Sequence, residues 1–137
     1  MLPISPKQPW YRRWFGTRSE RAAERFLKSK KHRILTRNWK CPLGELDLVT
    51  RDGETLVFVE VRSTESADSL SAAVSVDLQK QSQLTRLALA FIKRYSVQEV
   101  PARFDVVTIA WPADAKEPQV MHYPNAFPAV GRFGMYS

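Results

Sequence analysis

Residues 43–62 read Leu43-Gly-Glu-Leu-Asp-Leu-Val-Thr-Arg-Asp-Gly-Glu-Thr-Leu-Val-Phe-Val-Glu-Val-Arg62, a pattern typical of two β-strands joined by a tight turn. Asp52-Gly53 is a favoured central pair for a two-residue turn, because both central positions need a positive φ. With this pair at the tip, we expect Asp47 to face Phe58 and Glu45 to face Glu60. The stretch therefore predicts an antiparallel hairpin at the centre of the fold.

Alternation along each strand divides the side chains of this hairpin between two faces. We expect one face to be apolar without interruption, formed by Leu46, Leu48, Val57, Val59 and Val61. On the other face a short apolar patch gives way to charged residues: Glu45, Asp47, Glu60 and Arg62.

The charged end of the hairpin is unusual for a sheet. Phe58-Val59-Glu60-Val61 is typical of a strand covered on both faces, so Glu60 would be partly desolvated there. Carboxylates crowded in such a place need a proton, a cation or a bound metal, and a hard divalent ion with oxygen ligands is a natural partner. The alternative is an exposed polar face on which Arg62 pairs with Glu60.

The whole chain has 137 residues, 44% of them hydrophobic and 26% charged, which indicates one soluble globular domain. A single cysteine, Cys41, excludes an internal disulfide framework and suits a reducing compartment. No apolar run reaches the length of a membrane helix, and the proline-containing N-terminus does not resemble a secretory signal. We therefore expect a cytoplasmic protein that does not insert into a membrane.

The net charge of +7 is unevenly distributed along the chain. Residues 1–43 contain twelve Lys or Arg against two Glu, whereas residues 44–137 contain nine basic and twelve acidic side chains. A basic first third beside an acidic cluster suits a metal-dependent enzyme that acts on a polyanion, and the alternative is a basic face that only favours solubility.

The remaining elements follow from periodicity. Residues 1–16 are expected to form a basic and aromatic arm, which either contacts nucleic acid or pins itself to the domain, and residues 128–137 are expected to form a C-terminal tail.

The domain at 17–127 would begin with a helix over 18–31, with Thr17 or Ser19 as its N-cap, followed by a strand over 33–40 and the hairpin. Apolar residues at three- and four-residue spacing predict a helix over 77–95 capped by Asp77, with Lys80 near its start. Strands are expected at 104–111 and, at the edge, 120–123.

This order, αβββαβ plus an edge strand, predicts a three-layer α/β fold with a central mixed sheet flanked by helices. We see no zinc-ligand spacing and no Ser-His-Asp motif, and we expect the lone His122 to be structural rather than a metal ligand.

Several short motifs, taken together, resemble the YraN-like family of uncharacterised bacterial proteins over about residues 16–127. They are Arg18-Ser-Glu20, Ile34-Leu-Thr-Arg-Asn38, Gly44-Glu-Leu-Asp47, Leu56-Val-Phe-Val-Glu-Val61, Asp77…Lys80, Arg103-Phe-Asp-Val-Val107 and His122…Asn125-Ala-Phe127. That family is similar to archaeal Holliday-junction resolvases and to restriction endonucleases of the Asp…Glu-x-Lys kind. The resemblance implies a restriction-endonuclease-like fold and a nuclease site using Mg²⁺ or Mn²⁺. On that pattern Asp47 and Glu60 bind the metal, Val61 offers its backbone carbonyl, and Glu20 approaches the site.

Two residues depart from the family pattern. Arg62 stands where lysine is usual, and arginine does not shed its proton to activate a water. Ser19 stands where glycine is common. Arg62 and Lys80 are therefore expected to neutralise the phosphate in the transition state, and Glu45 to assist deprotonation.

Phosphodiester hydrolysis in DNA, branched or single-stranded, is the function that these features predict. Two alternatives remain: a nucleic-acid-binding protein of the same fold that has lost the chemistry, and a scaffold for an acidic protein. Resolvase-like relatives often form dimers, so a homodimer is a further expectation. Backbone phosphates would be held by basic residues of the arm and first helix: Arg12, Arg13, Arg18, Arg21, Arg25 and Lys28.

Overall fold

A five-stranded mixed sheet, in the order β1-β2-β3-β4-β5, lies between two helices in this computed structural model. The structure describes residues 10–65, 75–113 and 116–130, without the side chains of residues 10–17. Parts of the expected arm (1–9), of the connection after the hairpin (66–74) and of the C-terminal tail (131–137) lie outside this description. The elements are α1 (Trp10–Ser29), β1 (Arg33–Cys41), β2 (Gly44–Asp52), β3 (Thr55–Thr64), α3 (Leu78–Tyr95), β4 (Ala102–Ala110) and β5 (Gln119–Phe127).

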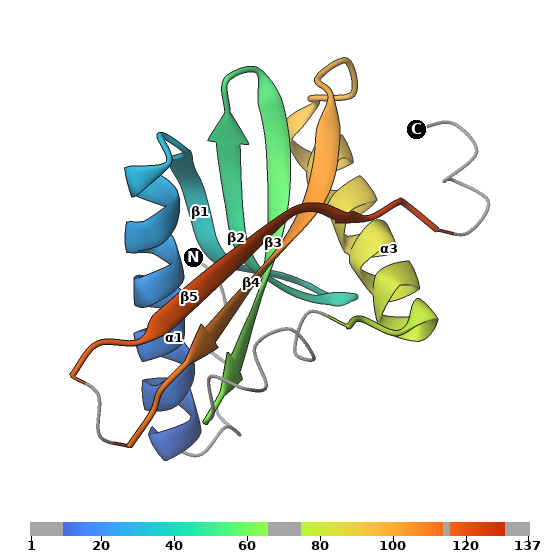
Figure 1. Cartoon of the computed structure of the whole chain (residues 1–137). Helices are drawn as coiled ribbons and strands as arrows, with labels where there is room; N and C mark the ends of the chain where they lie inside the picture. Colours follow the sequence, from blue (N-terminus) through green and yellow to red (C-terminus); the bar gives the residue numbers. More distant parts are fainter. Residues whose placement is uncertain (1–9, 66–74, 114–115, 131–137) are drawn as a thin grey trace.

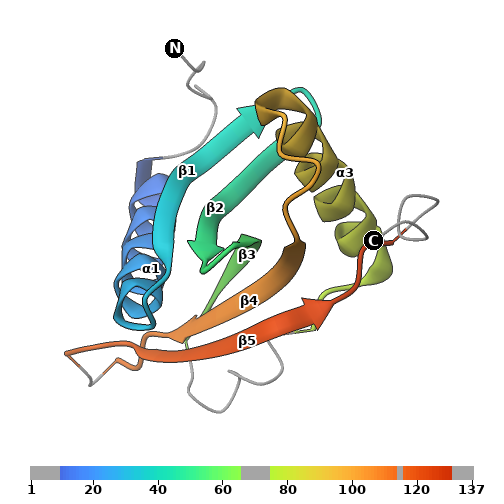
Figure 2. The ribbon, with the colours of Figure 1, turned by 90° about the horizontal axis from the view of Figure 1, so that it is seen from above.

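The strand directions confirm the predicted three-layer α/β fold. β1, β2 and β3 pair antiparallel, β3 and β4 pair parallel across the connection through α3, and β5 pairs antiparallel with β4 at the edge. Helix α1 covers one face of the sheet and α3 the other (Figures 1 and 2). This is the αβββαβ order with an additional edge strand that the sequence predicts, although β5 is longer than expected.

The register of the central hairpin differs from the prediction. Asp52 pairs with Thr55 and Leu48 with Val59, so the two turn residues are Gly53 and Glu54. Of these only Gly53 has a positive φ, at 61°. A two-residue turn with glycine at its first central position needs a positive φ at that glycine alone. The expected turn, with Asp52 and Gly53 as central residues, would have required a positive φ at Asp52 as well. The register is therefore shifted by two residues, which keeps most side chains on their predicted faces because the side-chain period of a strand is two.

The apolar residues form two clusters, one under each helix. Leu48, Val57, Val59 and Leu27 belong to the cluster under α1, whose other buried members are Ala22, Ala23, Val107 and Ile109. The cluster under α3 includes Phe58, Phe91, Phe104 and Trp39. Leu46 also packs in this second cluster, so the expectation that it shares a face with Leu48 was wrong.

Helix α1 begins at Trp10, earlier than the predicted start at Arg18, so residues 10–16 of the expected arm are helical. Neither Thr17 nor Ser19 caps the helix, because both lie inside it. Ser19 is 1% exposed, and its hydroxyl accepts hydrogen bonds from Ser63 Oγ and, over 2.9 Å, from Trp111 Nε1. A serine in mid-helix is tolerated here because its side chain fixes α1 to β3 and to the end of β4.

Helix α3 begins after Asp77, the predicted N-cap residue, and Lys80 in its first turn lies near Glu60 of β3. The Asp77 carboxylate accepts the backbone N–H of Lys80 over 2.8 Å. At the other end Ser96 adopts a left-handed conformation with φ 56°, which closes the helix. Within the described parts of the chain, no helix is long and apolar enough to cross a membrane.

Candidate functional site

Carboxylates from three elements converge at the end of β2 that is remote from the hairpin turn. Glu20 comes from the middle of α1, and Glu45 and Asp47 from the first half of β2. Each offers an oxygen atom within 4.8 Å of the other two. Glu60 of β3 joins them, since its negative charge helps to raise the pKa of Asp47. We call these four residues the carboxylate cluster.

Asn38 of β1 holds two members of this cluster together. Its side-chain amide donates to Glu20 Oε2 over 2.8 Å and to Glu45 Oε1 over 2.9 Å. The backbone of Asn38 has φ 49°, a conformation that asparagine tolerates better than most residues. Asn38 closes the motif Ile34-Leu-Thr-Arg-Asn38 without a predicted role, and its local signal is an asparagine interrupting a β-rich stretch.

The charges within the carboxylate cluster are poorly compensated. Burial raises the pKa of Asp47 well above its usual value, and the negative charges of Glu60 and Glu20 add to that shift, which the Val61 amide opposes. Burial also raises the pKa of Glu20, with the Asn38 amide opposing the shift and Glu45 adding to it. Oxygen ligands that repel one another in this way fit a hard divalent cation, which would bring the missing positive charge.

Two basic side chains border the cluster on the side of Glu60. Arg62 Nη2 lies 3.6 Å and Lys80 Nζ 3.8 Å from Glu60 Oε2. The Glu60 side chain is only 12% exposed, so the alternative of a fully solvated polar face is wrong, although its Arg62–Glu60 pair is present. Arg62 also donates to the carbonyl of Ser75, while its buried Nε finds no acceptor among the described residues.

All six residues expected to carry chemistry are therefore gathered at one place, from α1, β2, β3 and the start of α3: Glu20, Glu45, Asp47, Glu60, Arg62 and Lys80. Val61 is adjacent, and its backbone N–H donates to Asp47 Oδ2 over 2.9 Å. The expected contribution of its carbonyl to a metal site remains a prediction.

The basic residues expected to bind phosphates differ in their surroundings. Arg18, Arg21 and Arg25 are exposed on α1. Lys28 lies 3.3 Å from Glu24, which also pairs with Arg37, so part of its charge is already neutralised. Arg12 and Arg13 lie within the bounds of α1, but their side chains are outside the described part of the structure.

A second polar cluster, which the sequence analysis did not predict, lies at the opposite end of the sheet. Asp105 of β4 is completely buried, and His122 Nε2 lies 2.7 Å from it. Arg103 Nε and the backbone N–H of Asn125 each donate to Asp105 Oδ1 over 2.9 Å. His32 lies nearby, with its ring centre 5.7 Å from that of His122. Arg103, His122 and Asn125 already occupy both oxygens of Asp105. His32, Asp105 and His122 nevertheless place ligand atoms within 4.8 Å of one another, so the structural role expected for His122 remains a prediction.

Residues 19–109 match the sequence profile of the Uncharacterised protein family UPF0102. The UPF0102 protein of Geobacter sulfurreducens is 40% identical over 112 residues, which cover 82% of this chain and 87% of the relative. That of Pelotomaculum thermopropionicum is 40% identical over 116 residues, covering 85% and 97%. That of Stutzerimonas stutzeri is 43% identical over 103 residues, covering 74% and 86%. The family match spans the carboxylate cluster and most of the fold around it.

Proposed function

This chain belongs to the Uncharacterised protein family UPF0102, and we propose that it is a metal-dependent nuclease that hydrolyses phosphodiester bonds in DNA. The observation that carries this proposal is the carboxylate cluster, in which Glu20, Glu45 and Asp47 place oxygens within 4.8 Å of one another beside Glu60. A structural cluster of this kind would be expected to contain its own counter-charge. Here Arg62 and Lys80 lie beside Glu60 and Lys40 lies 3.8 Å from Glu45, yet burial and the neighbouring negative charges still raise the pKa of Asp47.

The combination of clustered carboxylates with neighbouring basic side chains suits phosphoryl chemistry. Asp47 and Glu60 would hold Mg²⁺ or Mn²⁺, with Glu20 and Glu45 near enough to complete the ligand set directly or through water. When bound, such an ion supplies Lewis-acid polarisation of a phosphoryl oxygen and lowers the pKa of a bound water.

The protein's own residues have distinct tasks in this proposal. Glu45, held by Asn38, accepts a proton from the attacking water. Arg62 and Lys80, which both lie beside Glu60, compensate the negative charge that grows on the phosphate. Because arginine keeps its proton, Arg62 acts as an electrostatic group and not as a base.

DNA would approach over the exposed surface of α1. Arg21 and Arg25 line the hollow that also contains Glu20 and Asn38, so cations flank the acidic cluster on its helix side. Contacts from such side chains to backbone phosphates give affinity without sequence readout.

A nucleic-acid-binding protein without catalysis is the second candidate, and one observation favours it. Arg62 is engaged with both Glu60 and the Ser75 carbonyl, which is the geometry of a residue held in a structural ion pair. This candidate keeps the basic surface of α1 but does not need a metal.

Metal binding separates the two candidates. Isothermal titration of the full chain with Mn²⁺ and Mg²⁺ should show one saturable site, which Asp47→Ala abolishes and which Glu54→Ala, an exposed carboxylate at the hairpin turn, leaves intact. Cleavage of branched and single-stranded DNA with Mn²⁺ should be lost in Glu60→Gln. If the wild type binds no metal and cleaves none of these DNAs, the nuclease proposal is wrong.

A further inference from the structure

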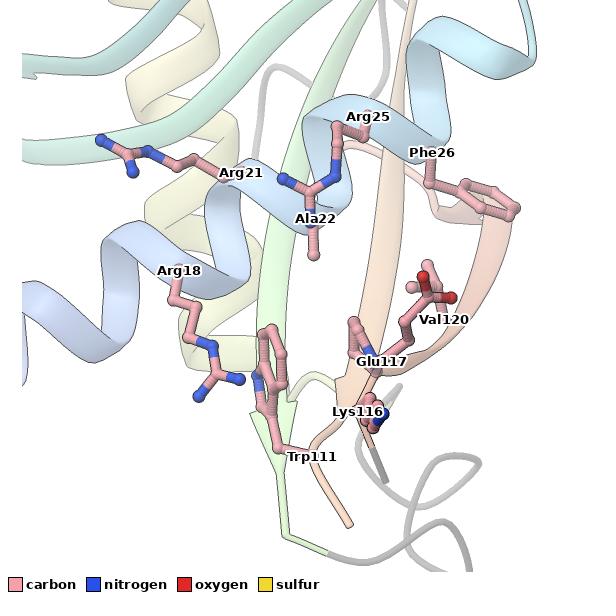
Figure 3. Close-up of a pocket in the computed structure, with 10 residues that line it drawn as sticks. Arg18, Arg21, Ala22, Arg25, Phe26, Trp111, Lys116, Glu117 and Val120 are labelled. Atoms are coloured by element: carbon pink, nitrogen blue, oxygen red, sulfur yellow. The ribbon is translucent and has the colours of Figure 1, made fainter. Parts of the chain in front are cut away.

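A large hollow of about 1000 Å³ lies beside α1 (Figure 3). One wall is the helix, and the other is the end of β4 with the segment leading into β5. Four basic side chains and one carboxylate line it: Arg18, Arg21, Arg25, Lys116 and Glu117. The excess of positive charge indicates an anionic occupant.

Aromatic surface is interleaved with these charges. Trp111 and Phe26 both line the hollow and are both half-buried. The guanidinium carbon of Arg18 lies 3.8 Å from the centre of the Trp111 ring, so a planar cation and a planar indole are stacked at the wall (Figure 3). Planar groups beside cations are what a nucleobase and its phosphate require, whereas an acidic peptide offers carboxylates without a flat ring.

The hollow is physically connected to the carboxylate cluster. Trp111 Nε1 and Ser63 Oγ both donate to the hydroxyl of Ser19. Ser19 directly precedes Glu20, and Ser63 directly follows Arg62. The same three residues therefore fix the wall of the hollow, the helix and the strand that carries the proposed catalytic groups.

Arg21 and Arg25 line both hollows, the one on the side of the carboxylate cluster and the one on the side of Trp111. They thus form a ridge of positive charge between the two. A DNA strand whose phosphates lie on this ridge would have one neighbouring nucleotide directed toward Trp111 and another toward Glu20.

We propose that the hollow between α1, Trp111 and residues 116–120 binds an unpaired nucleotide of the DNA that is cleaved at the carboxylate cluster. This inference rests on the proposed nuclease function and gives it a substrate class: DNA with a single-stranded segment adjoining the scissile bond. The base stacks against the Arg18–Trp111 pair, and its phosphate contacts Arg25 or Lys116. A base in a duplex cannot make this contact, because both of its ring faces are already covered by its neighbours.

Binding of a fluorescein-labelled hairpin DNA to the full chain tests this inference. The same hairpin is compared with and without a short unpaired tail, by fluorescence anisotropy in EDTA so that no cleavage occurs. We expect the tailed DNA to bind about tenfold tighter, the scale of one stacked base. Arg18→Ala and Lys116→Glu should remove this preference. Lys93→Glu, the same charge reversal near the end of α3, should preserve it.

Trp111→Phe extends the test and retains a ring while losing the hydrogen bond to Ser19. Circular dichroism and the melting temperature show whether the Trp111→Phe protein folds. If it does not fold, the Arg18→Ala and Lys116→Glu variants test the inference. Equal affinity for tailed and blunt DNA in the wild type overturns the inference while the nuclease proposal stands. Displacement of tailed DNA by polyglutamate at matched charge overturns it in favour of an acidic protein partner. If neither DNA binds, both the inference and the proposed function are wrong.

Discussion

The backbone N–H of Val61 donates a hydrogen bond to the carboxylate of Asp47 over 2.9 Å, just beyond the point where β2 and β3 stop pairing at Leu48 and Val59. The Asp47 side chain thus accepts the backbone N–H of Val61, two residues beyond Val59, the last residue of β3 that pairs with β2. This bond fixes Asp47 beside Glu60 and favours the ionised carboxylate, but burial and the neighbouring negative charges still raise the pKa of Asp47. The fold therefore keeps this carboxyl group in place while its surroundings disfavour the ionised form.

Asp47→Asn should stabilise the protein in the absence of metal. The substitution removes one negative charge from the carboxylate cluster, and the amide oxygen of asparagine can still accept the Val61 N–H. We expect the free energy of unfolding at neutral pH to rise by about 0.5–2 kcal/mol, a usual gain when an unfavourable functional arrangement is relieved. Urea denaturation measures it. Because the raised pKa of Asp47 favours its protonated form in the folded state, the gain should shrink as the pH falls through that pKa.

Mn²⁺ should reverse this order of stabilities. At a metal concentration about a hundredfold above its dissociation constant, the wild type should gain about 2.7 kcal/mol, while Asp47→Asn gains little. The melting temperature with and without Mn²⁺ gives the comparison, and Glu54→Gln serves as a control for loss of an exposed carboxylate. An Asp47→Asn protein that is less stable than the wild type in both conditions would show that the carboxylate is structural.

Arg62→Lys should retain or increase cleavage of DNA with Mn²⁺. Lysine keeps the positive charge near Glu60 and adds an amine that can shed its proton when desolvated. Arg62→Gln removes the charge and should lower the cleavage rate by more than tenfold, measured in single-turnover reactions. If the two variants have equal rates and equally reduced melting temperatures, Arg62 acts as the structural partner of Glu60 and not in phosphate stabilisation.

DNA affinity should fall steeply with salt and depend unequally on the basic residues of α1. Several phosphate contacts imply a loss of roughly a hundredfold or more between low and moderate salt. Arg21→Glu and Arg25→Glu should each weaken binding and reduce the salt slope by about one. Lys28→Glu should weaken it less, since Glu24 already lies 3.3 Å from Lys28. Fluorescence anisotropy over a salt series measures all three, and equal effects would contradict the neutralisation of Lys28.

Mild acid should destabilise the protein through His32. Burial lowers the pKa of His32, and the nearby charges of Asp52 and Asp105 only partly oppose this, while His122 and Arg103 add to it. The unfolded chain then binds the proton more readily, so the stability from neutral His32 is complete above about pH 6.5 and is lost as the pH falls toward the lower folded value. Urea midpoints between about pH 7 and pH 5 should decline in the wild type.

His32→Gln should flatten this decline, while His122→Gln, which changes the only other histidine, should retain it. The decline persisting unchanged in His32→Gln would assign it to another group. The prediction is independent of the proposed nuclease site, because His32 lies at the opposite end of the sheet.

Local chemistry was sufficient to predict most elements of this fold. The apolar spacing of Leu84, Leu87 and Phe91 predicts α3, and Asp77 predicts its start, since helix periodicity and capping depend on neighbouring residues. The alternation around Gly53 predicts the hairpin and its two faces. The carboxylates at its end already marked Asp47 and Glu60 as the candidate site.

Local sequence patterns did not predict which residues form the hairpin turn or where α1 begins. Gly53 satisfies either of two tight turns, and only the pairing of whole strands selects between them. Trp10–Thr17 has weak helix signals of its own, and the structure shows that this segment continues the helix that carries Ser19 and Glu20.

The arrangement of groups far apart in sequence was decided by tertiary structure alone. Asn38 bridges Glu20 and Glu45 because α1 packs across β1 and β2. Likewise His32, Asp105 and His122 come from separate segments of the chain and meet only in the folded sheet. Periodicity determines which face of an element a side chain occupies, whereas the distance between two elements depends on how the helix packs on the twisted sheet. The sequence alone therefore determined which carboxylates were unusual, and only the packing of α1 on the sheet decided that they form one site.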